Sequence, residues 1–247
     1  MRRDACVSPI LMLMLPMRLT RSDAIFWCAW VMLLAAFAAL SVWAHYAYFL
    51  PFEQHVLETL ERNHDSVPLS ERTLGYLSDL GRVPVIVALV VIVAALLVVR
   101  RAFVEALAVA GVLPMGVAQI GVRHLIDRPQ DPSRIPTLDF QYPYGASFPS
   151  GHAFGEFMVF GLLFVFAPLI VPQRAAWITV RIVCVLLVLA SGLERVVDGA
   201  HWPSDVIGAY MLALLYVSAA AWICTRVRRS SARMLGAGRQ QATVLKT

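Results

Sequence analysis

Apolar runs of similar length repeat along the chain, and short polar connections separate them. In chain order the runs cover residues 24–50, 83–99, 103–122, 154–171, 176–193 and 206–224. Each run is close to the ~20 residues that a helix needs to cross the hydrocarbon core of a bilayer. The pattern therefore predicts an all-α fold, a bundle of six transmembrane helices with external loops that hold the functional site.

The composition is typical of a membrane protein with one domain. Hydrophobic residues make up 59% of the 247 residues and charged residues 15%, whereas soluble domains hold ~25% charged residues. Six spans and their connections use the whole length, so we expect no soluble domain in addition to the membrane domain. We divide the chain into an N-terminal cytoplasmic tail (1–23), a membrane domain (24–225) and a basic cytoplasmic C-terminal tail (226–247).

Basic residues predict the orientation, because the cytoplasmic ends of spans carry an excess of Lys and Arg. With the N-terminus inside, the cytoplasmic segments hold 14 of the 21 Lys and Arg residues. We therefore expect both termini in the cytoplasm and the loops 123–152 and 194–205 on the opposite face. The net charge of +5 lies mainly at the ends of the spans, so it indicates topology and no nucleic-acid partner.

Neither the cysteines nor the N-terminal region changes this picture. The four cysteines form no Cys-x-x-Cys pair, so we expect neither a disulfide framework nor a thiolate metal site. The apolar stretch 9–17 is too short to cross a bilayer, and no small-residue cleavage site follows it. We therefore expect no cleaved signal peptide.

The first external connection, 51–82, has apolar residues at helical spacing in both of its halves. This spacing predicts short amphipathic helices that lie on the outer membrane surface beside the site. Ser70 is the expected N-cap of the second helix and Gly81 its expected stop. A plain packed loop is the alternative.

The connection 194–205 carries one group of reactive side chains. Arg195 precedes His201 by six residues, and Asp205 follows His201 by four. If the last helix begins here, the i, i+4 spacing sets the Asp205 carboxylate against the His201 ring. A carboxylate that accepts the proton of one ring nitrogen leaves the other nitrogen free as a nucleophile or base. A histidine that only anchors the helix at the lipid headgroups is the alternative.

The second group precedes the fourth apolar run and reads Pro149-Ser150-Gly151-His152. Ser150 is a favourable N-cap, and the unpaired N–H groups of a first helical turn bind anions. We therefore expect an anion site beside His152, with a simple capped helix start as the alternative. Both groups fall on the same side of the membrane in this prediction, so a bundle of six helices can bring them together at its external end.

These two groups resemble motifs of the type-2 phosphatidic acid phosphatase superfamily, which shares its phosphate site with vanadium haloperoxidases. The family motifs are Lys-x6-Arg-Pro, Pro-Ser-Gly-His and Ser-Arg-x5-His-x3-Asp, in that order. The second is complete at 149–152, and the third matches at Arg195, His201 and Asp205, with Glu194 in place of the usual Ser. The resemblance covers about half the chain and implies six spans with the motifs on the non-cytoplasmic side.

The first motif departs from the family pattern. Many bacterial members read Lys-x4-Arg-Pro-Arg-Pro, and here Arg123 stands for the Lys and Arg128 for the first Arg. Gln130 occupies the position of the second, phosphate-binding Arg. We expect Arg128 or Arg134 to supply the missing charge; alternatively, the site is tuned to a less charged phosphate group.

The resemblance implies a metal-independent phosphatase that needs no cofactor. His201 would attack phosphorus to give a phosphohistidine while Asp205 orients its ring. His152 would protonate the leaving oxygen and then activate the water that releases phosphate. The expected phosphate ligands are Arg195, Arg123, Arg128 and the N–H groups of Ser150 and Gly151.

Two carboxylates in spans also need a role, because burying a charge in hydrocarbon is costly. Glu156 follows His152 by four residues, so it either tunes His152 or contacts a substrate group, or is a buried neutral carboxyl. Glu105 is expected to snorkel or to pair with Arg101. Gln130 is a second candidate for tuning the site.

The implied substrate is a membrane lipid whose phosphate or diphosphate projects at the headgroup level. Undecaprenyl diphosphate, phosphatidylglycerophosphate, phosphatidate and lipid A phosphate fit this description. We expect a bacterial-type inner membrane protein whose site faces the periplasm or the cell exterior. A lipid phosphotransferase of the same family and a non-catalytic lipid transporter are the alternatives, and the sequence leaves the oligomeric state open.

Overall fold

The computed structural model describes residues 20–47, 50–62, 71–128 and 146–244. Within these ranges the regular elements are helices, which confirms the all-α prediction. In chain order they are α2 (Arg21–Tyr46), α3 (Pro51–Arg62), α4 (Glu71–Leu80), α5 (Val83–Val99), α6 (Phe103–Ala110), α7 (Val112–Ile126), α8 (Gly151–Ile170), α9 (Arg174–Val197) and α10 (Pro203–Val244).

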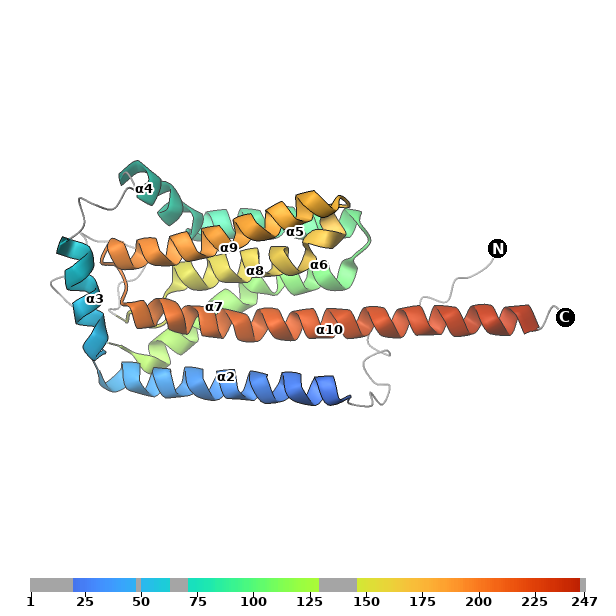
Figure 1. Ribbon diagram of the computed structural model, residues 1–247, viewed down its shortest axis with the longest axis horizontal. Coiled ribbons are helices and arrows are strands. Elements are labelled where there is room, and N and C mark those ends of the chain that lie inside the picture. The colour runs from blue at the N-terminus through green and yellow to red at the C-terminus, as the bar shows by residue number, and fades with distance from the viewer. Residues whose placement is uncertain (1–19, 48–49, 63–70, 129–145, 245–247) are drawn as a thin grey trace.

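The long helices lie side by side in an elongated bundle (Figure 1). The central helix is α8, which contacts α5, α7, α9 and α10. The short helix α3 lies across one end of the bundle, where α2, α7 and α9 end and α8 and α10 begin (Figure 1). The two connections that carry the family motifs therefore meet at the end of the bundle that α3 covers.

Among the described residues, five segments are helical, long and apolar enough to cross a membrane. They are α2, α6 together with α7 (Phe103–Ile126), α8, α9 and the Pro203–Ala232 part of α10. The second predicted span, α5, is strongly apolar but has only 17 residues. The pattern of apolar runs thus locates every long helix, and α5 is the short member of the set.

The third predicted span is broken at Gly111, between α6 and α7. Pro114 follows Ala110 by four residues and has no N–H to donate to the Ala110 carbonyl, so the helical ladder loses a bond there. Beside the break, the Tyr216 hydroxyl of α10 donates to the Ala108 carbonyl at 2.7 Å. The hydrogen bond ties α10 to α6 where the α6–α7 segment is interrupted.

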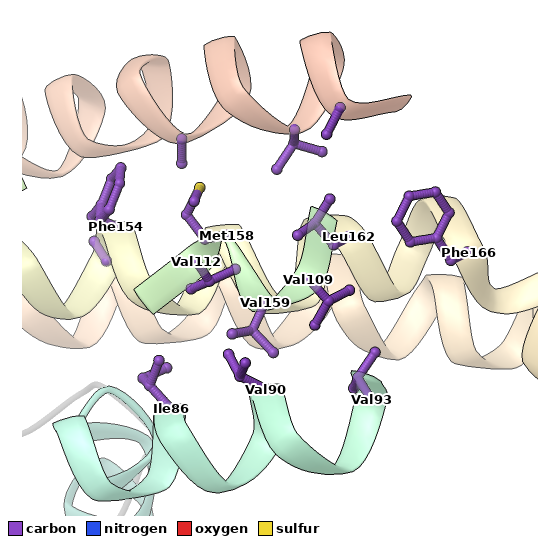
Figure 2. Close-up of a cluster of buried hydrophobic side chains, with 14 of the residues drawn as sticks. Ile86, Val90, Val93, Val109, Val112, Phe154, Met158, Val159, Leu162 and Phe166 are labelled. Carbon is purple, nitrogen blue, oxygen red and sulfur yellow. The ribbon is translucent and has the colours of Figure 1, made fainter. Parts of the chain in front are cut away.

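The core of the bundle is built on α8. Figure 2 shows side chains of α8 that recur every four residues and face buried side chains of neighbouring helices. The buried residues labelled there include Phe154, Met158, Leu162 and Phe166 of α8 with Ile86, Val90 and Val93 of α5. Because lipid tails are as apolar as these side chains, close packing rather than exclusion of water stabilises the cluster.

Two helix ends differ from the ends of the predicted apolar runs. The helix α8 begins at Gly151, three residues before its apolar run, because Ser150 caps it. The last helix continues to Val244, so the expected start of the C-terminal tail at residue 226 is not a helix end.

The expected pairing of Glu105 with Arg101 is wrong. Arg228 of α10 donates to a Glu105 carboxylate oxygen instead. Arg101 lies in the turn between α5 and α6 with a left-handed φ of 57°. The continuation of α10 as a helix brings Arg228 to the buried carboxylate, and the sequence pattern of separate spans does not indicate that.

The external connection forms two helices, α3 and α4, as the helical spacing predicts. Gly81 directly follows α4, as expected of a stop residue. Ser70, the expected N-cap, lies outside the described residues. Both helices stand at the end of the bundle that holds the family motifs (Figure 1).

Candidate active site

The pair that the spacing predicts in the α9–α10 connection is present. The ring nitrogen Nδ1 of His201 lies 3.3 Å from Oδ2 of Asp205, and the Trp202 backbone N–H donates to the same oxygen at 3.0 Å. The backbone N–H of His201 donates to the Arg195 carbonyl at 3.1 Å, which holds the connection close to the end of α9. The Asp205 side chain is fully buried, and 9% of the His201 side chain is exposed.

Arg128 has partners that its sequence neighbours do not indicate. Its Nη1 donates to Oδ1 of Asp205 at 2.5 Å and to the Ser204 hydroxyl at 2.7 Å. Its Nη2 lies 3.0 Å from Oε2 of Glu53, on α3. The guanidinium is buried between the carboxylates of Asp205 and Glu53, and the phosphate contact expected of Arg128 stays a prediction.

Ser150 joins the two motif segments directly. Its hydroxyl accepts from the Ala153 N–H at 3.5 Å, as an N-cap does. Its own backbone N–H donates to the Asp205 carbonyl at 3.1 Å. This N–H group therefore joins α8 to α10, which differs from the phosphate contact expected of it. The N–H groups of Gly151 and His152 lie in the first turn of α8, where a helix offers no internal partner.

The last turns of α7 fix the start of α8. Gln119 donates from Nε2 to the Pro149 carbonyl at 2.8 Å, and Arg123 donates from Nε to the Ala146 carbonyl. Both side chains are buried. Arg123, one helical turn beyond Gln119, is thus held on the site side of α7.

Arg195 is held by groups from two helices. Its Nε donates to Oε2 of Glu194 at 2.5 Å, and its Nη2 pairs with the other oxygen of that carboxylate. Nη2 also donates to the Ser78 hydroxyl of α4 at 2.6 Å. The carboxylate of Asp198 lies 3.8 Å away. Glu194, the residue that departs from the third family motif, thus contacts the Nε and Nη2 edge of the Arg195 guanidinium.

His152 and Glu156 lie one turn apart on α8, as their spacing predicts, and the turn after α4 covers them. A methyl group added at Gly81 would lie 2.5 Å from Cδ2 of His152 and 2.8 Å from Oε1 of Glu156. The absence of a side chain at Gly81 is therefore what allows this close approach. Oε1 of Glu156 is buried and has no hydrogen-bond partner among the described residues.

The electrostatic surroundings favour a neutral His201. Burial lowers the pKa of His201, and the charges of Arg123 and Arg195 lower it further. The hydrogen bond and the negative charge of Asp205 raise the pKa of His201 and offset part of this effect. The pKa of His201 remains below its ordinary value, so the ring is neutral, with a free nitrogen lone pair, near neutral pH.

The remaining expected site residues, Gln130 and Arg134, lie outside the described residues. Within the described part of the chain, no group of three or more His, Cys, Asp or Glu side chains is placed to hold a metal ion. Among the described residues, Arg123 of α7, Arg195 of α9 and Arg128 of the loop after α7 bring positive charge to the site.

The sequence pattern does not predict a place at the site for Glu53, Ser78, Gln119 and Ser204, nor the contact of Gly81 with His152. Gln119 has a signal, since it stands one helical turn before Arg123 on the same face. Glu53 and Ser78 have none, because only the packing of α3 and α4 onto the bundle end brings them to Arg128 and Arg195.

Comparison with known proteins gives the family of this helical bundle with its His201–Asp205 pair. The model of the PAP2 superfamily matches residues 86–229, more than half of the chain, and the chain belongs to this superfamily. A crystal structure described as the first transmembrane PAP2-type phosphatidylglycerolphosphate phosphatase, from Bacillus subtilis, is similar in fold, with a TM-score of 0.62. That match has 21% sequence identity and covers 77% of this chain and 93% of the other. No curated protein matches the chain in sequence.

Proposed function

We propose that this protein is a membrane-embedded phosphatase that hydrolyses lipid phosphates or diphosphates through a phosphohistidine. The observation that carries the proposal is the His201–Asp205 pair, with Nδ1 and Oδ2 3.3 Å apart. Asp205 holds Nδ1 as the protonated nitrogen, so Nε2 keeps its lone pair for attack. Membership of the PAP2 superfamily supports phosphoryl transfer as the reaction class.

The reaction has two balanced steps. Nε2 of His201 forms a bond to phosphorus while the bond from phosphorus to the leaving oxygen breaks, and His152 gives that oxygen a proton. Water then attacks the phosphohistidine, His152 takes a proton from the water, and the nitrogen–phosphorus bond breaks to release phosphate. Asp205 stabilises the imidazolium that exists between the two steps.

The phosphate ligands in this proposal are fewer than the sequence suggested. Arg123, Arg195 and the first-turn N–H groups of Gly151 and His152 surround the phosphoryl oxygens and offset their charge. Arg128 is assigned to Asp205 because both ends of its guanidinium are held by carboxylates. Among the described residues, the clamp therefore has less positive charge than the family pattern. Gln130 stands where that pattern has its second arginine, and Arg134 stays a candidate for the missing charge.

We propose six crossings, with α5 as the short one and both termini in the cytoplasm. The first described helix, α2, begins at the end of the bundle towards which α10 runs, which supports an even number of crossings (Figure 1). With this orientation 14 of the 21 Lys and Arg residues are cytoplasmic. The site then faces the periplasm or exterior of a bacterial-type inner membrane.

The substrate in this proposal is a lipid because the site lies at the end of the membrane bundle, where headgroups are found. Monophosphates such as phosphatidate and phosphatidylglycerophosphate and diphosphates such as undecaprenyl diphosphate present the same reacting group there. A phosphotransferase would use the same phosphohistidine and pass it to another lipid instead of water. A lipid transporter has no use for a nucleophile oriented by a carboxylate.

The test is release of phosphate from a panel of these lipids by the purified full chain in detergent, with EDTA present. We expect hydrolysis with EDTA present, loss of activity in His201→Ala, and incorporation of oxygen from labelled water into the released phosphate. Transfer of phosphate to a lipid acceptor without labelled oxygen would favour the phosphotransferase. No turnover of any phosphate or diphosphate lipid would contradict the proposal.

A further inference from the structure

The helix α3 precedes the residues that match the family model, yet it supplies a buried carboxylate to the site. We propose that Glu53 is a positioning residue that holds Arg128 against Asp205 and thereby sets the basicity of His201. The proposal rests on the proposed function for its kinetic consequences, and its structural part stands on the contacts of Glu53 alone.

Glu53 uses both carboxylate oxygens, and each contact is to a different segment. Oε1 accepts from the backbone N–H of Ser204 at 2.7 Å, in the first turn of α10. Oε2 accepts from the backbone N–H of Leu50 at 2.7 Å and from Nη2 of Arg128 at 3.0 Å. The side chain is fully buried. One carboxylate thus joins α3, the start of α10 and the loop after α7.

The contacts continue from Glu53 to the reacting ring. Nη1 of Arg128 donates to Oδ1 of Asp205 at 2.5 Å, while Oδ2 of the same carboxylate faces Nδ1 of His201 at 3.3 Å. Any shift of the guanidinium therefore moves Asp205, and through it the ring. Glu53 reaches Ser204, next to Asp205 in the chain, as well as Arg128, so it limits that shift from two directions.

The charges give Glu53 a role beyond geometry. A buried arginine needs a compensating carboxylate. If Asp205 were the only carboxylate beside Arg128, the guanidinium would neutralise most of the negative charge of Asp205. Little of that charge would then stabilise a protonated His201. Glu53 supplies the second carboxylate, so the triad of Glu53, Arg128 and Asp205 keeps one net negative charge beside the ring.

The first test is Glu53→Gln, which keeps the shape and removes the charge. We expect kcat/KM to fall by roughly 10–100-fold, the usual loss when a group that orients a reacting residue is removed. We also expect the acid limb of kcat/KM to move to lower pH, because less negative charge then faces His201. The charged or titratable groups facing His201 itself are Arg123 on α7, His152 on α8, Arg195 on α9 and Asp205 on α10. Glu53 acts on the ring through Arg128 and Asp205.

The matched control is Glu58→Gln, which removes a half-buried carboxylate from the same helix. We expect kcat/KM to stay within about twofold of the parent and the acid limb not to move, since substitutions away from buried charge networks have small effects. Glu53→Asp keeps the charge but shortens the side chain. It should lower kcat/KM without moving the acid limb, and it serves as the second variant if Glu53→Gln does not fold.

A double-mutant cycle tests the coupling between Glu53 and Arg128. Arg128→Gln leaves two buried carboxylates without their shared cation, so it should lose more activity than Glu53→Gln. Adding Glu53→Gln to Arg128→Gln removes one of those carboxylates and should recover at least about threefold in kcat/KM. Losses that simply multiply would overturn the proposed coupling.

A measurement without turnover separates this proposal from the proposed function. The pKa of His201 can be followed by NMR of ring-labelled histidine in the full chain, with its signal assigned by its absence in His201→Gln. We expect a lower pKa of His201 in Glu53→Gln and an unchanged one in Glu58→Gln. An unchanged pKa of His201 in a folded Glu53→Gln protein would overturn the proposal, even if the parent hydrolyses lipid phosphates. A lowered one would support it even if none is hydrolysed.

Discussion

At the scale of single residues, the contacts between charged side chains define the site. Asp205 faces His201 and Arg128, while Glu194 faces Arg195. A phosphoryl group that binds Arg195 must therefore compete with a carboxylate already in contact with it. If Arg195 binds the phosphate as proposed, we expect the identity of residue 194 to set how tightly it does so.

Glu194→Ser should lower KM by about tenfold, because a charge-assisted contact of ~1.5–3 kcal/mol becomes available to the phosphate. The thermal stability of the ligand-free protein should fall, since a buried arginine loses its partner. Asp198→Asn is the control, because that carboxylate is 54% exposed and 3.8 Å from Arg195. A higher KM in Glu194→Ser would show that Glu194 orients Arg195 instead of competing with the phosphate.

The pH dependence follows from the charges around His201. In the proposed mechanism attack requires the neutral ring of His201, so kcat/KM should rise as the pH increases through the pKa of His201, which burial lowers. Asp205→Asn should move this acid limb to lower pH, because it removes the charge that raises the pKa of His201. Arg123→Gln should move it to higher pH, because it removes a charge that lowers it. The measurement is the dependence of kcat/KM on pH for the parent and both variants with one substrate, so that the titration of the substrate is the same in every profile. The two variants should shift the acid limb in opposite directions. Shifts in one direction for both variants would contradict this account.

At the scale of elements, the helices α3 and α4 close the site from outside the matched family segment. Glu53 comes from α3, Ser78 from α4, and Gly81 from the turn that follows it. The two connections that carry the motifs are joined by a backbone hydrogen bond from Ser150 to Asp205. The site is therefore assembled by packing between elements and not by any single loop.

Gly81→Ala tests the contact of the α4–α5 turn with α8. The added methyl group would overlap His152 and Glu156, so His152 must move and kcat/KM should fall by at least about tenfold. Gly75→Ala is a matched control, because a methyl group there meets nothing within 4 Å. Equal activity of the two variants in a kinetic assay, with both proteins folded, would show that the turn does not position His152.

How well the sequence predicts a helix or a contact depends on how far apart in the chain the interacting residues are. Periodicity locates the spans, and short spacings locate the His201–Asp205 pair and the Ser150 cap, because these contacts lie within one helical turn. It does not find the partner of Arg128, since Glu53 is 75 residues away. Only the packing of α3 onto the end of the bundle brings this carboxylate to the buried arginine.

At the scale of the whole molecule, the orientation in the membrane decides which lipids reach the site. In a cysteine-free background, the Ala200→Cys variant, in the connection that carries His201, should react with an impermeant thiol reagent in intact cells. The Ala232→Cys variant, at an exposed position of α10 towards the other end of the bundle, should react only after lysis. The reverse pattern would place the site in the cytoplasm.

The most direct test of the central claim is to locate the phosphoryl group during turnover. A substrate with a good leaving group should accumulate the intermediate in the parent and, without the need for an acid, in His152→Ala. Mass spectrometry of peptides from a reaction stopped at alkaline pH, where phosphohistidine is stable, identifies the modified residue. We predict phosphate on His201 in both proteins and no labelled residue in His201→Ala, which should also be inactive. Phosphate on a different residue, or turnover by His201→Ala, would contradict the mechanism.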